Sequence, residues 1–199
     1  MTSSKNPEMP VDSGVPAGST ARPVRADVRI VPWRDDHAGA LCRIADHPGI
    51  AANMAERFPS PYTMQDAQRW VALSVADPAR PAWAIEAQGA LAGGIGLRPL
   101  AGGSAHCAVL SYWLGEAFWG AGIASAAVRQ AVDVAFDQLG LIRIETTVFS
   151  WNVASARVLK KCGFAHEGTL RKSFNKKGVL VDRDIYALLR DDRPTPARP

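Results

Sequence analysis

YWLGEAFWGAGIASAAVRQAVDVA, residues Tyr112–Ala135, is the stretch that decides the fold. An apolar segment typical of a strand ends in a short loop, the loop closes on Gly120-Ala121-Gly122, and a helix of small residues begins at once. The first N–H groups of a helix have no partner within it, and they lie at the positive end of the helix dipole. We therefore expect an anion, such as a phosphate ester, to bind at this loop.

The residue types of the loop suit that purpose. Gly120 and Gly122 let the main chain approach a ligand without a Cβ in the way, and the Ser125 hydroxyl adds a donor. Spacing alone leaves a second interpretation open, in which Gly-Ala-Gly is only a tight turn between a strand and a helix. A dinucleotide-binding turn would need a third glycine where Ser125 stands. A Walker loop is excluded because no Gly-Lys-Ser/Thr follows.

The composition is that of an ordinary globular domain. The chain has 199 residues, 47% of them hydrophobic and 21% charged, with a net charge of +4. The chain has three cysteines, and none of them has the Cys-x-x-Cys spacing of a disulfide or zinc site; they are Cys42, Cys107 and Cys162. We therefore expect no disulfide framework and no metal site, and the reduced cysteines predict a cytoplasmic location. No apolar run is long enough for a membrane span or a secretory signal. No dense basic block favours nucleic acid.

The pattern along the chain predicts one α/β (α+β) domain over residues 27–190. Residues 1–26 and 191–199 are expected to be a disordered and a loose tail, because few large apolar groups occur there. The elements between them would form a mixed, mostly antiparallel sheet flanked by helices. Strands are predicted over 28–33, 82–87, 90–97, 107–114, 142–149, 165–174 and 182–188, and helices over 36–45, 63–75, 122–139 and 152–162.

Two blocks in this order resemble the GNAT superfamily of N-acetyltransferases, in particular its RimJ/RimL-type branch. The first is FWGAGIASAA, in which Trp119 stands where the superfamily pattern [QR]-x-x-G-x-[GA] has Gln or Arg. The second, within RIETTVFSWNVASARVLKKCGFAHEGTLR, fits N-x-x-S-x-x-V-L-x-K-x-G-F without a gap. The likeness covers about residues 28–190 and implies the GNAT fold, with two parallel strands splayed apart, and acetyltransferase activity.

The resemblance implies acetyl-coenzyme A bound between the strands 107–114 and 142–149. Its pantetheine arm would pair with the main chain of Trp113 and Leu114. Asn152 would hydrogen-bond the pantetheine, and Arg157 and Lys161 are candidates for the far end of the cofactor, although a solvated helix face explains them as well. The pyrophosphate would rest on Trp119, Gly120, Ala121, Gly122, Ile123, Ala124 and Ser125.

The implied reaction is attack by a neutral amine on a thioester, which needs an N–H for the developing oxyanion and a proton for the thiolate. Leu159 stands where much of the superfamily has a Tyr donor, so the resemblance assigns this role to Ser155. An equal alternative is that Ser155 only anchors the cofactor or caps its helix. Tyr186 is a further candidate donor, although an aromatic residue on this strand is more often part of the core.

A dedicated base is harder to identify. Val109 and Phe174 occupy two positions where relatives carry acidic residues. The remaining candidates are Asp182, Glu145 and His106, and each has an ordinary structural explanation as well. A site without a strong base suits an α-amine, whose pKa of about 7.7–8.0 leaves a sizeable neutral fraction at pH 7.

The acceptor pocket is expected between the early helices and the last two strands. Asn53, Arg57, Tyr62 and Phe174 are the candidate substrate-binding residues, and packing is the alternative for Tyr62. The expected acceptor is a primary amine, such as a peptide N-terminus. The alternatives are a small-molecule amine (an amino acid, polyamine or antibiotic) and a non-catalytic coenzyme A sensor. Dimers are common in such families, so a homodimer is considered, although no sequence feature requires one.

Overall fold

The computed structural model describes residues 27–193. The tail predicted over 1–26 lies outside the described residues, as do the last six residues of the tail predicted over 191–199. Seven strands form one sheet in the order β1-β2-β3-β4-β5-β7-β6. Their bounds are β1 Val28–Pro32, β2 Ala82–Ala87, β3 Ala90–Pro99, β4 Cys107–Leu114, β5 Arg143–Phe149, β6 Ala165–Lys176 and β7 Val179–Leu189.

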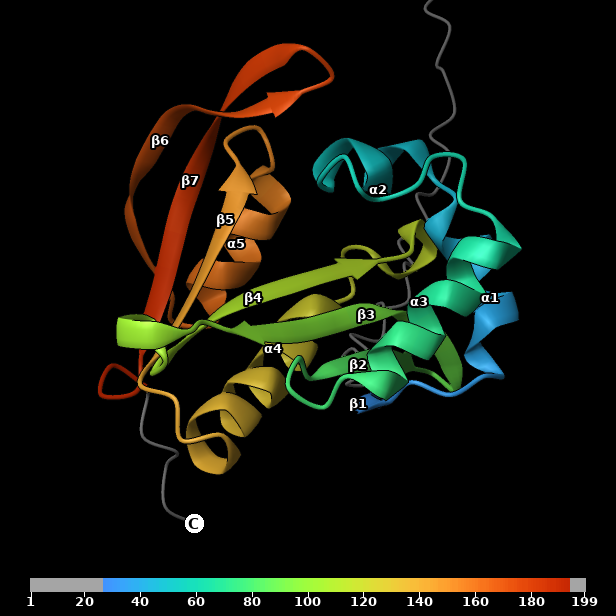
Figure 1. Cartoon of the computed structure of the whole chain (residues 1–199), viewed down its shortest axis with the longest axis horizontal. Helices are drawn as coiled ribbons and strands as arrows, with labels where there is room; N and C mark the ends of the chain where they lie inside the picture. The colour runs from blue at the N-terminus through green and yellow to red at the C-terminus, as the bar shows by residue number, and fades with distance from the viewer. Residues whose placement is uncertain (1–26, 194–199) are drawn as a thin grey trace, which may run out of the picture.

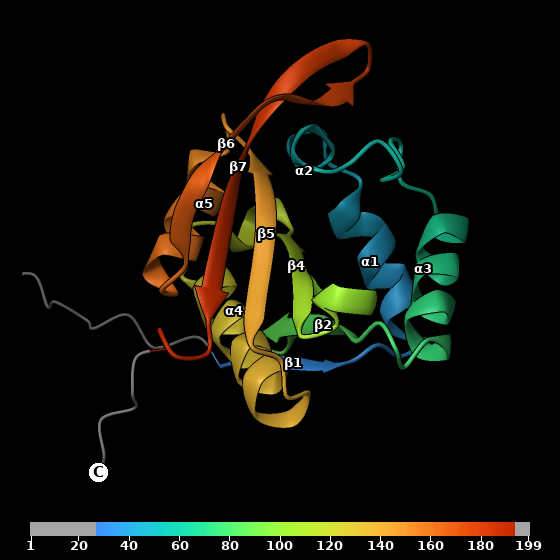
Figure 2. The same ribbon diagram turned by 60° about the vertical axis from the view of Figure 1, so that its left-hand side comes forward.

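Helices cover both faces of this sheet, with α1 and α3 on one side and α4 and α5 on the other (Figures 1 and 2). A core cluster lies on each side, one around Ile123 and Leu159 and the other around Leu41 and Val71. The predicted fold class is therefore confirmed. The helices are α1 His37–Ala45, α2 Pro48–Asn53, α3 Met64–Ala76, α4 Ile123–Asp133 and α5 Val153–Lys161, with short turns η1 Gly102–Ser104, η2 Glu116–Phe118 and η3 Val134–Gln138.

The parallel pair β4–β5 is joined only at its start. Cys107, Ala108 and Val109 pair with Arg143, Ile144 and Glu145, and the register ends there, whereas all other neighbouring strands are antiparallel. Beyond this point the two strands diverge (Figure 1). Each keeps its outer neighbour, because β4 stays paired with β3 and β5 with β7. The main-chain groups that face the opening on β4 therefore have no partner strand.

Local sequence signals explain most of the element ends. Thr63 caps α3 with a complete capping box, in which its hydroxyl accepts from the Asp66 N–H and the Asp66 carboxylate accepts from the Thr63 N–H. Gly163 ends α5 with a φ of +90°, as a C-terminal glycine should. The helix predicted over 122–139 ends as an α-helix at Asp133 and continues as the π-turn η3. The two predicted early helices are present as α1 and α3, and the sequence analysis missed α2, which lies between them.

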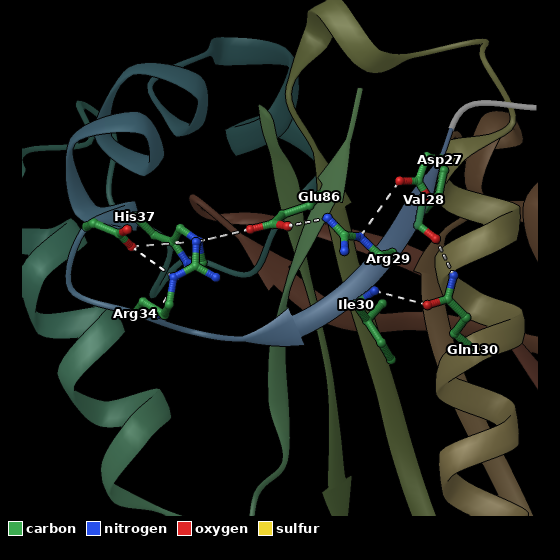
Figure 3. Close-up of polar contacts among 9 residues, drawn as sticks. Asp27, Val28, Arg29, Ile30, Arg34, His37, Glu86 and Gln130 are labelled. Atoms are coloured by element: carbon green, nitrogen blue, oxygen red, sulfur yellow. Dashed lines mark hydrogen bonds and ion pairs between the residues drawn. The ribbon is translucent and has the colours of Figure 1, made fainter. Parts of the chain in front are cut away.

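The edge strand β1 is attached to α4 by one amide side chain (Figure 3). The Gln130 Oε1 accepts from the Ile30 N–H at 3.0 Å, and its Nε2 donates to the Val28 carbonyl at 2.8 Å. On the neighbouring strand, the Glu86 carboxylate pairs with the guanidinium groups of Arg34 and Arg29 at 3.2 and 3.6 Å. The two Gln130 bonds occupy main-chain groups at the free edge of the sheet, which would otherwise be exposed and unpaired.

Candidate active site

The loop between β4 and α4 has the geometry expected of an anion cradle. Gly122 is the N-cap of α4 with a φ of +78°, and it has no side chain to satisfy the helix N–H groups. The first main-chain bond of the helix runs from the Ala126 N–H to the Gly122 carbonyl at 3.1 Å. The N–H groups of Ile123, Ala124 and Ser125 therefore point out of the helix end. Ser125, which is 7% exposed, stands in the first turn of α4 and contributes one of these N–H groups.

The Trp119 side chain anchors this loop to the end of β4. Its indole Nε1 donates to the Leu114 carbonyl at 2.9 Å, and its ring meets the edge of the His47 ring at 5.7 Å between centroids. His47 accepts the Gly49 N–H on Nδ1 at 3.1 Å and contacts the Glu116 carboxylate with Nε2 at 2.9 Å. The loop and the first turn of α2 are thus joined through one imidazole.

The register of β3 and β4 decides which main-chain groups face the opening. Trp113 pairs with Gly94, and the Gly115 N–H donates to the Ala92 carbonyl at 2.9 Å. Because successive residues of a strand point their N–H and C=O groups to opposite sides, Trp113 and Gly115 face β3 and Leu114 faces the opening. Of the two residues predicted to pair with pantetheine, the register therefore favours Leu114. The Trp113 side chain instead packs beside the second core cluster, against Phe58.

Ser155, in the first turn of α5, and Tyr112, on β4, meet across the opening. Their hydroxyl oxygens are 2.8 Å apart, and the Tyr112 O–H also lies 3.3 Å from the Ser155 carbonyl oxygen. Asn152 caps α5, since its Oδ1 accepts the Ser155 N–H at 3.0 Å. The helix is therefore capped by Asn152 and not by the Ser155 side chain, which leaves the Ser155 hydroxyl for the contact with Tyr112. Tyr112 was missed in the sequence, although it stands beside the predicted cofactor residues.

Burial sets the protonation state of this tyrosine. It raises the pKa of Tyr112 to about 12, although the hydrogen bond with Ser155 opposes the shift. The phenol keeps its proton at neutral pH, and either hydroxyl can be the donor in the bond between them. A hydroxyl that accepts such a bond becomes a better donor through its own hydrogen, because hydrogen bonds in a chain polarise one another. The pair can thus present one O–H to an anion in the opening.

Asp182 and Tyr186 are placed apart from this pair, and neither forms a hydrogen bond with it in the described structure. The Asp182 Oδ1 accepts the Lys172 N–H at 2.7 Å, so this carboxylate stabilises an irregular part of β6. Tyr186 is buried in the core cluster around Ile123 and Leu159, and the centroids of its ring and the His166 ring are 5.0 Å apart. Burial raises the pKa of Tyr186, and the neighbouring Asp184 adds to the rise. These contacts favour the structural explanation for both residues.

The other two candidate bases also have structural partners. Glu145 accepts from the Arg143 Nε at 3.0 Å, and the same guanidinium holds Glu167, whose pKa is lowered mainly by that bond. His106 is exposed, and its carbonyl accepts the Ile142 N–H at 2.9 Å where β5 begins. Leu159, at the position of the superfamily's tyrosine donor, is fully buried in the core.

The predicted acceptor residues divide into two groups. Asn53 lies near the diverging end of β5, since its Oδ1 accepts from the Trp151 Nε1 at 3.2 Å. Phe174 also lies near this end of β5, since the centroids of its ring and the Phe149 ring are 5.3 Å apart. Tyr62, in contrast, is 7% exposed and packs against Phe58, so its position supports the packing alternative. Arg57 is exposed after α2.

Arg157 and Lys161, predicted for the far end of the cofactor, lie exposed on α5. Neither forms an ion pair with a carboxylate within residues 27–193. The Lys161 carbonyl accepts from Arg129 at 3.3 Å, which brings a third cation to the gap between α4 and α5. This arrangement suits an anion without requiring one.

Two tyrosines with raised pKa values predict how stability depends on pH. Burial raises the pKa of Tyr62 to about 12, with Asp66 and Cys42 adding to the rise, and the pKa of Tyr112 reaches the same range. The unfolded chain loses these protons first, so the stability is fully present below pH 10 and falls from there to pH 12. The slope is up to about 1.4 kcal/mol per pH unit for each tyrosine. Urea unfolding at pH 9 and 11 should show a smaller fall for Tyr62→Phe, and an equal fall in both proteins would contradict this prediction.

Comparison with known proteins agrees with this geometry. Residues 27–165 match the acetyltransferase (GNAT) domain family. A probable N-acetyltransferase of Bacillus subtilis, YjcK, is 41% identical over 102 residues, which are 51% of this chain and 56% of that protein. An L-amino acid N-acetyltransferase of Escherichia coli, AaaT, is 41% identical over 61 residues, 31% of this chain and 38% of that protein. The chain thus spans about half the length, or less, of the curated relatives it matches.

Among solved structures, Mycobacterium smegmatis RimJ in complex with a coenzyme A disulfide superimposes with a TM-score of 0.77. The two chains are 25% identical, and the match covers 86% of this chain and 87% of RimJ, in line with the predicted RimJ/RimL-type branch. Residues 27–193 contain no helix long and apolar enough to cross a bilayer and no group of three or more side chains suited to a metal ion. The family match covers well over half of the chain and the fold agrees with it, so this protein belongs to the acetyltransferase (GNAT) domain family.

Proposed function

We propose that this protein transfers the acetyl group of acetyl-coenzyme A to a primary amine, and that a peptide N-terminal α-amine is the acceptor. The observation that carries the proposal is the opening between β4 and β5. The N-terminus of α4 follows β4 on one side of it, and the Ser155–Tyr112 pair spans from β4 to the first turn of α5. An elongated ligand with an anionic end and a reactive thioester end fits these two features.

The chain's own groups suggest how the ligand would be held. The outward N–H groups of Ile123, Ala124 and Ser125 would bind the diphosphate, helped by the positive end of the α4 dipole. The open edge at Leu114 would pair with the pantetheine amides as an added strand does. Asn152, which already fixes the first turn of α5, would contact the same arm through its amide NH₂ group.

Acetyl-coenzyme A supplies an acetyl thioester, and the protein supplies position and hydrogen bonds. The neutral amine attacks the carbonyl carbon, and the C–S bond breaks as the new C–N bond is completed. An N–H of the open edge of β4 that is not paired with pantetheine would stabilise the oxygen as it gains charge. Ser155, supported by Tyr112, would give a proton to the leaving thiolate. The attacking nitrogen would lose a proton to water, and through water this proton would restore the Ser155 hydroxyl.

The partners of the candidate bases support an α-amine. Asp182 and Glu145 both have structural partners, and within residues 27–193 no carboxylate forms a hydrogen bond with Ser155. About 10–20% of an α-amine is already neutral at pH 7, against roughly 0.04% of a lysine side chain. A free amino acid also offers an α-amine, and the likeness to AaaT makes it the second candidate acceptor.

The proposal is tested by release of free thiol from acetyl-coenzyme A with a panel of acceptors. The panel contains short peptides with free and blocked N-termini, free amino acids, spermidine and Nα-blocked lysine. We expect turnover with free α-amines and little with blocked lysine at pH 7. A clear preference for the lysine side chain would overturn the choice of acceptor. Binding of coenzyme A without turnover of any amine would instead identify a sensor.

A further inference from the structure

Six cations border the side from which an acceptor would approach, and we call them the basic rim. They lie on the β6–β7 hairpin and just after α2. None of them is within ion-pair distance of a carboxylate in the described part of the chain, whereas five other arginines are. The basic rim consists of Arg57, Arg171, Lys172, Lys176, Lys177 and Arg183.

Two members of the rim are held firmly beside the aromatic end of β5. The Lys176 Nζ donates to the carbonyls of Ala51 and Met54 at 3.1 and 2.6 Å, and lies 4.9 Å from the centre of the Phe149 ring. The Arg183 guanidinium lies 5.3 Å from the centre of the Phe174 ring. Carbonyl and aromatic partners leave the charge of each cation unneutralised, so both contribute a positive field at this end of the opening.

Two further members line a hollow. The register of β6 and β7 shifts between Leu170 and Phe174, which leaves Arg171 and Lys172 without partners in the ladder. They border a hollow of about 390 Å³ together with Asp182, whose carboxylate is engaged by the Lys172 N–H. The hollow adjoins the end of β5, because the Ser150 N–H donates to the Asp182 carbonyl at 3.2 Å.

Acidic groups do not cancel this charge. Glu56 and Asp182 are the carboxylates that contact the rim, and each accepts from a main-chain N–H, of Lys177 and Lys172 respectively. The rim and its two carboxylates therefore keep an excess of positive charge. A cleft edge lined with one sign of charge raises the local concentration of ligands of the opposite sign and accelerates their association.

From this charge, and resting on the function proposed above, we propose that the acceptor is anionic: its α-amine is accompanied by carboxylates that the basic rim attracts. An acidic peptide N-terminus and a free acidic amino acid share this chemistry. A polyamine has the opposite charge and would be repelled. The rim would act mainly on kcat/KM, since it attracts the acceptor and does not touch the reacting atoms.

The first test compares three peptides that begin with the same residue and continue with Asp-Glu, Asn-Gln or Lys-Lys, alongside free glutamate. At low ionic strength we expect kcat/KM to fall in that order, by about tenfold or more between the first and last peptides. The difference should shrink at 0.5 M salt, because screening weakens exposed charges. Glutamate used as well as the acidic peptide would identify the small acceptor. Equal use of the three peptides would refute the charge preference while leaving the acetyltransferase proposal intact.

The second test reverses the hollow's charge with Arg171→Glu combined with Lys172→Glu. This variant should lose its preference for the acidic peptide and use the Lys-Lys peptide better than the wild type does. Arg69→Glu, an exposed change on α3, makes half that change of net charge away from the rim and should keep the wild-type order. An unchanged order in the double variant would overturn the inference. No turnover by the wild type with any amine would count against the proposed function instead.

Discussion

Replacing Ser155 by Ala is expected to lower kcat for acetyl transfer by roughly 10²-fold or more, which is the usual size of a general-acid contribution. The reason is that the leaving thiolate would lose the hydroxyl that the Tyr112 contact holds in place at 2.8 Å. The Kd of coenzyme A, measured by calorimetry, should change little. A Kd that rises in parallel with the loss of rate would identify Ser155 as an anchor of the cofactor and not as its proton donor.

Tyr112→Phe tests whether the two hydroxyls act together. It removes the phenol O–H and keeps the ring, so we expect kcat to fall about tenfold with normal coenzyme A affinity. Combined with Ser155→Ala it should add little, because residues in one hydrogen-bonded unit are not additive. Tyr186→Phe is the matched control, since this second buried tyrosine does not contact Ser155. A larger loss in Tyr186→Phe than in Tyr112→Phe would assign the proton donor to β7.

Gly122→Val should raise the Kd of coenzyme A at least tenfold. A Cβ at this position meets no protein atom within 4 Å, so the protein itself leaves room for a side chain. The φ of +78° strains any β-branched residue, and the added methyl groups would stand where the diphosphate meets the outward N–H groups. Loss of one charge-assisted hydrogen bond, about 1.5–3 kcal/mol, already accounts for a tenfold change.

Gly89→Val separates strain from loss of the binding site. Gly89 lies in the turn between β2 and β3 with a φ of +76°, and a Cβ there is equally free of contacts. The two variants should therefore lose similar stability in thermal unfolding, and only Gly122→Val should lose coenzyme A affinity. If Gly122→Val binds coenzyme A as the wild type does, the loop is not the diphosphate site.

Signals within short stretches of sequence were sufficient for most of the fold. The strands 82–87 and 107–114 were predicted at the bounds that the structure gives for β2 and β4, and the strand 90–97 was predicted with the correct start of β3. The capping box of Thr63 and the glycine at 163 fix helix ends through contacts three or four residues away. The loop before α4 could also be predicted from a short stretch of sequence, because the residues next to a helix N-terminus determine its geometry.

Features that depend on distant contacts were not predicted. The helix α2 has six residues and begins with Pro48-Gly49, a pair typical of turns, and it is held by the His47 contacts with the loop and by Lys176. The contact of Tyr112 with Ser155 joins residues 43 positions apart. The strands gave no sign of where β4 parts from β5, because neither predicted strand is interrupted at Val109 or at Glu145, where the pairing ends. Tertiary packing decides such features, and their residues look ordinary in the sequence.

A crystal structure of the protein with coenzyme A is the most direct test of how the ligand is held. We expect the diphosphate oxygens within hydrogen-bonding distance of the main-chain N–H groups at the start of α4, the pantetheine arm along the open edge of β4, and the sulfur beside the Ser155 hydroxyl. Coenzyme A bound outside the opening between β4 and β5, or with its diphosphate away from Gly122, would contradict the account.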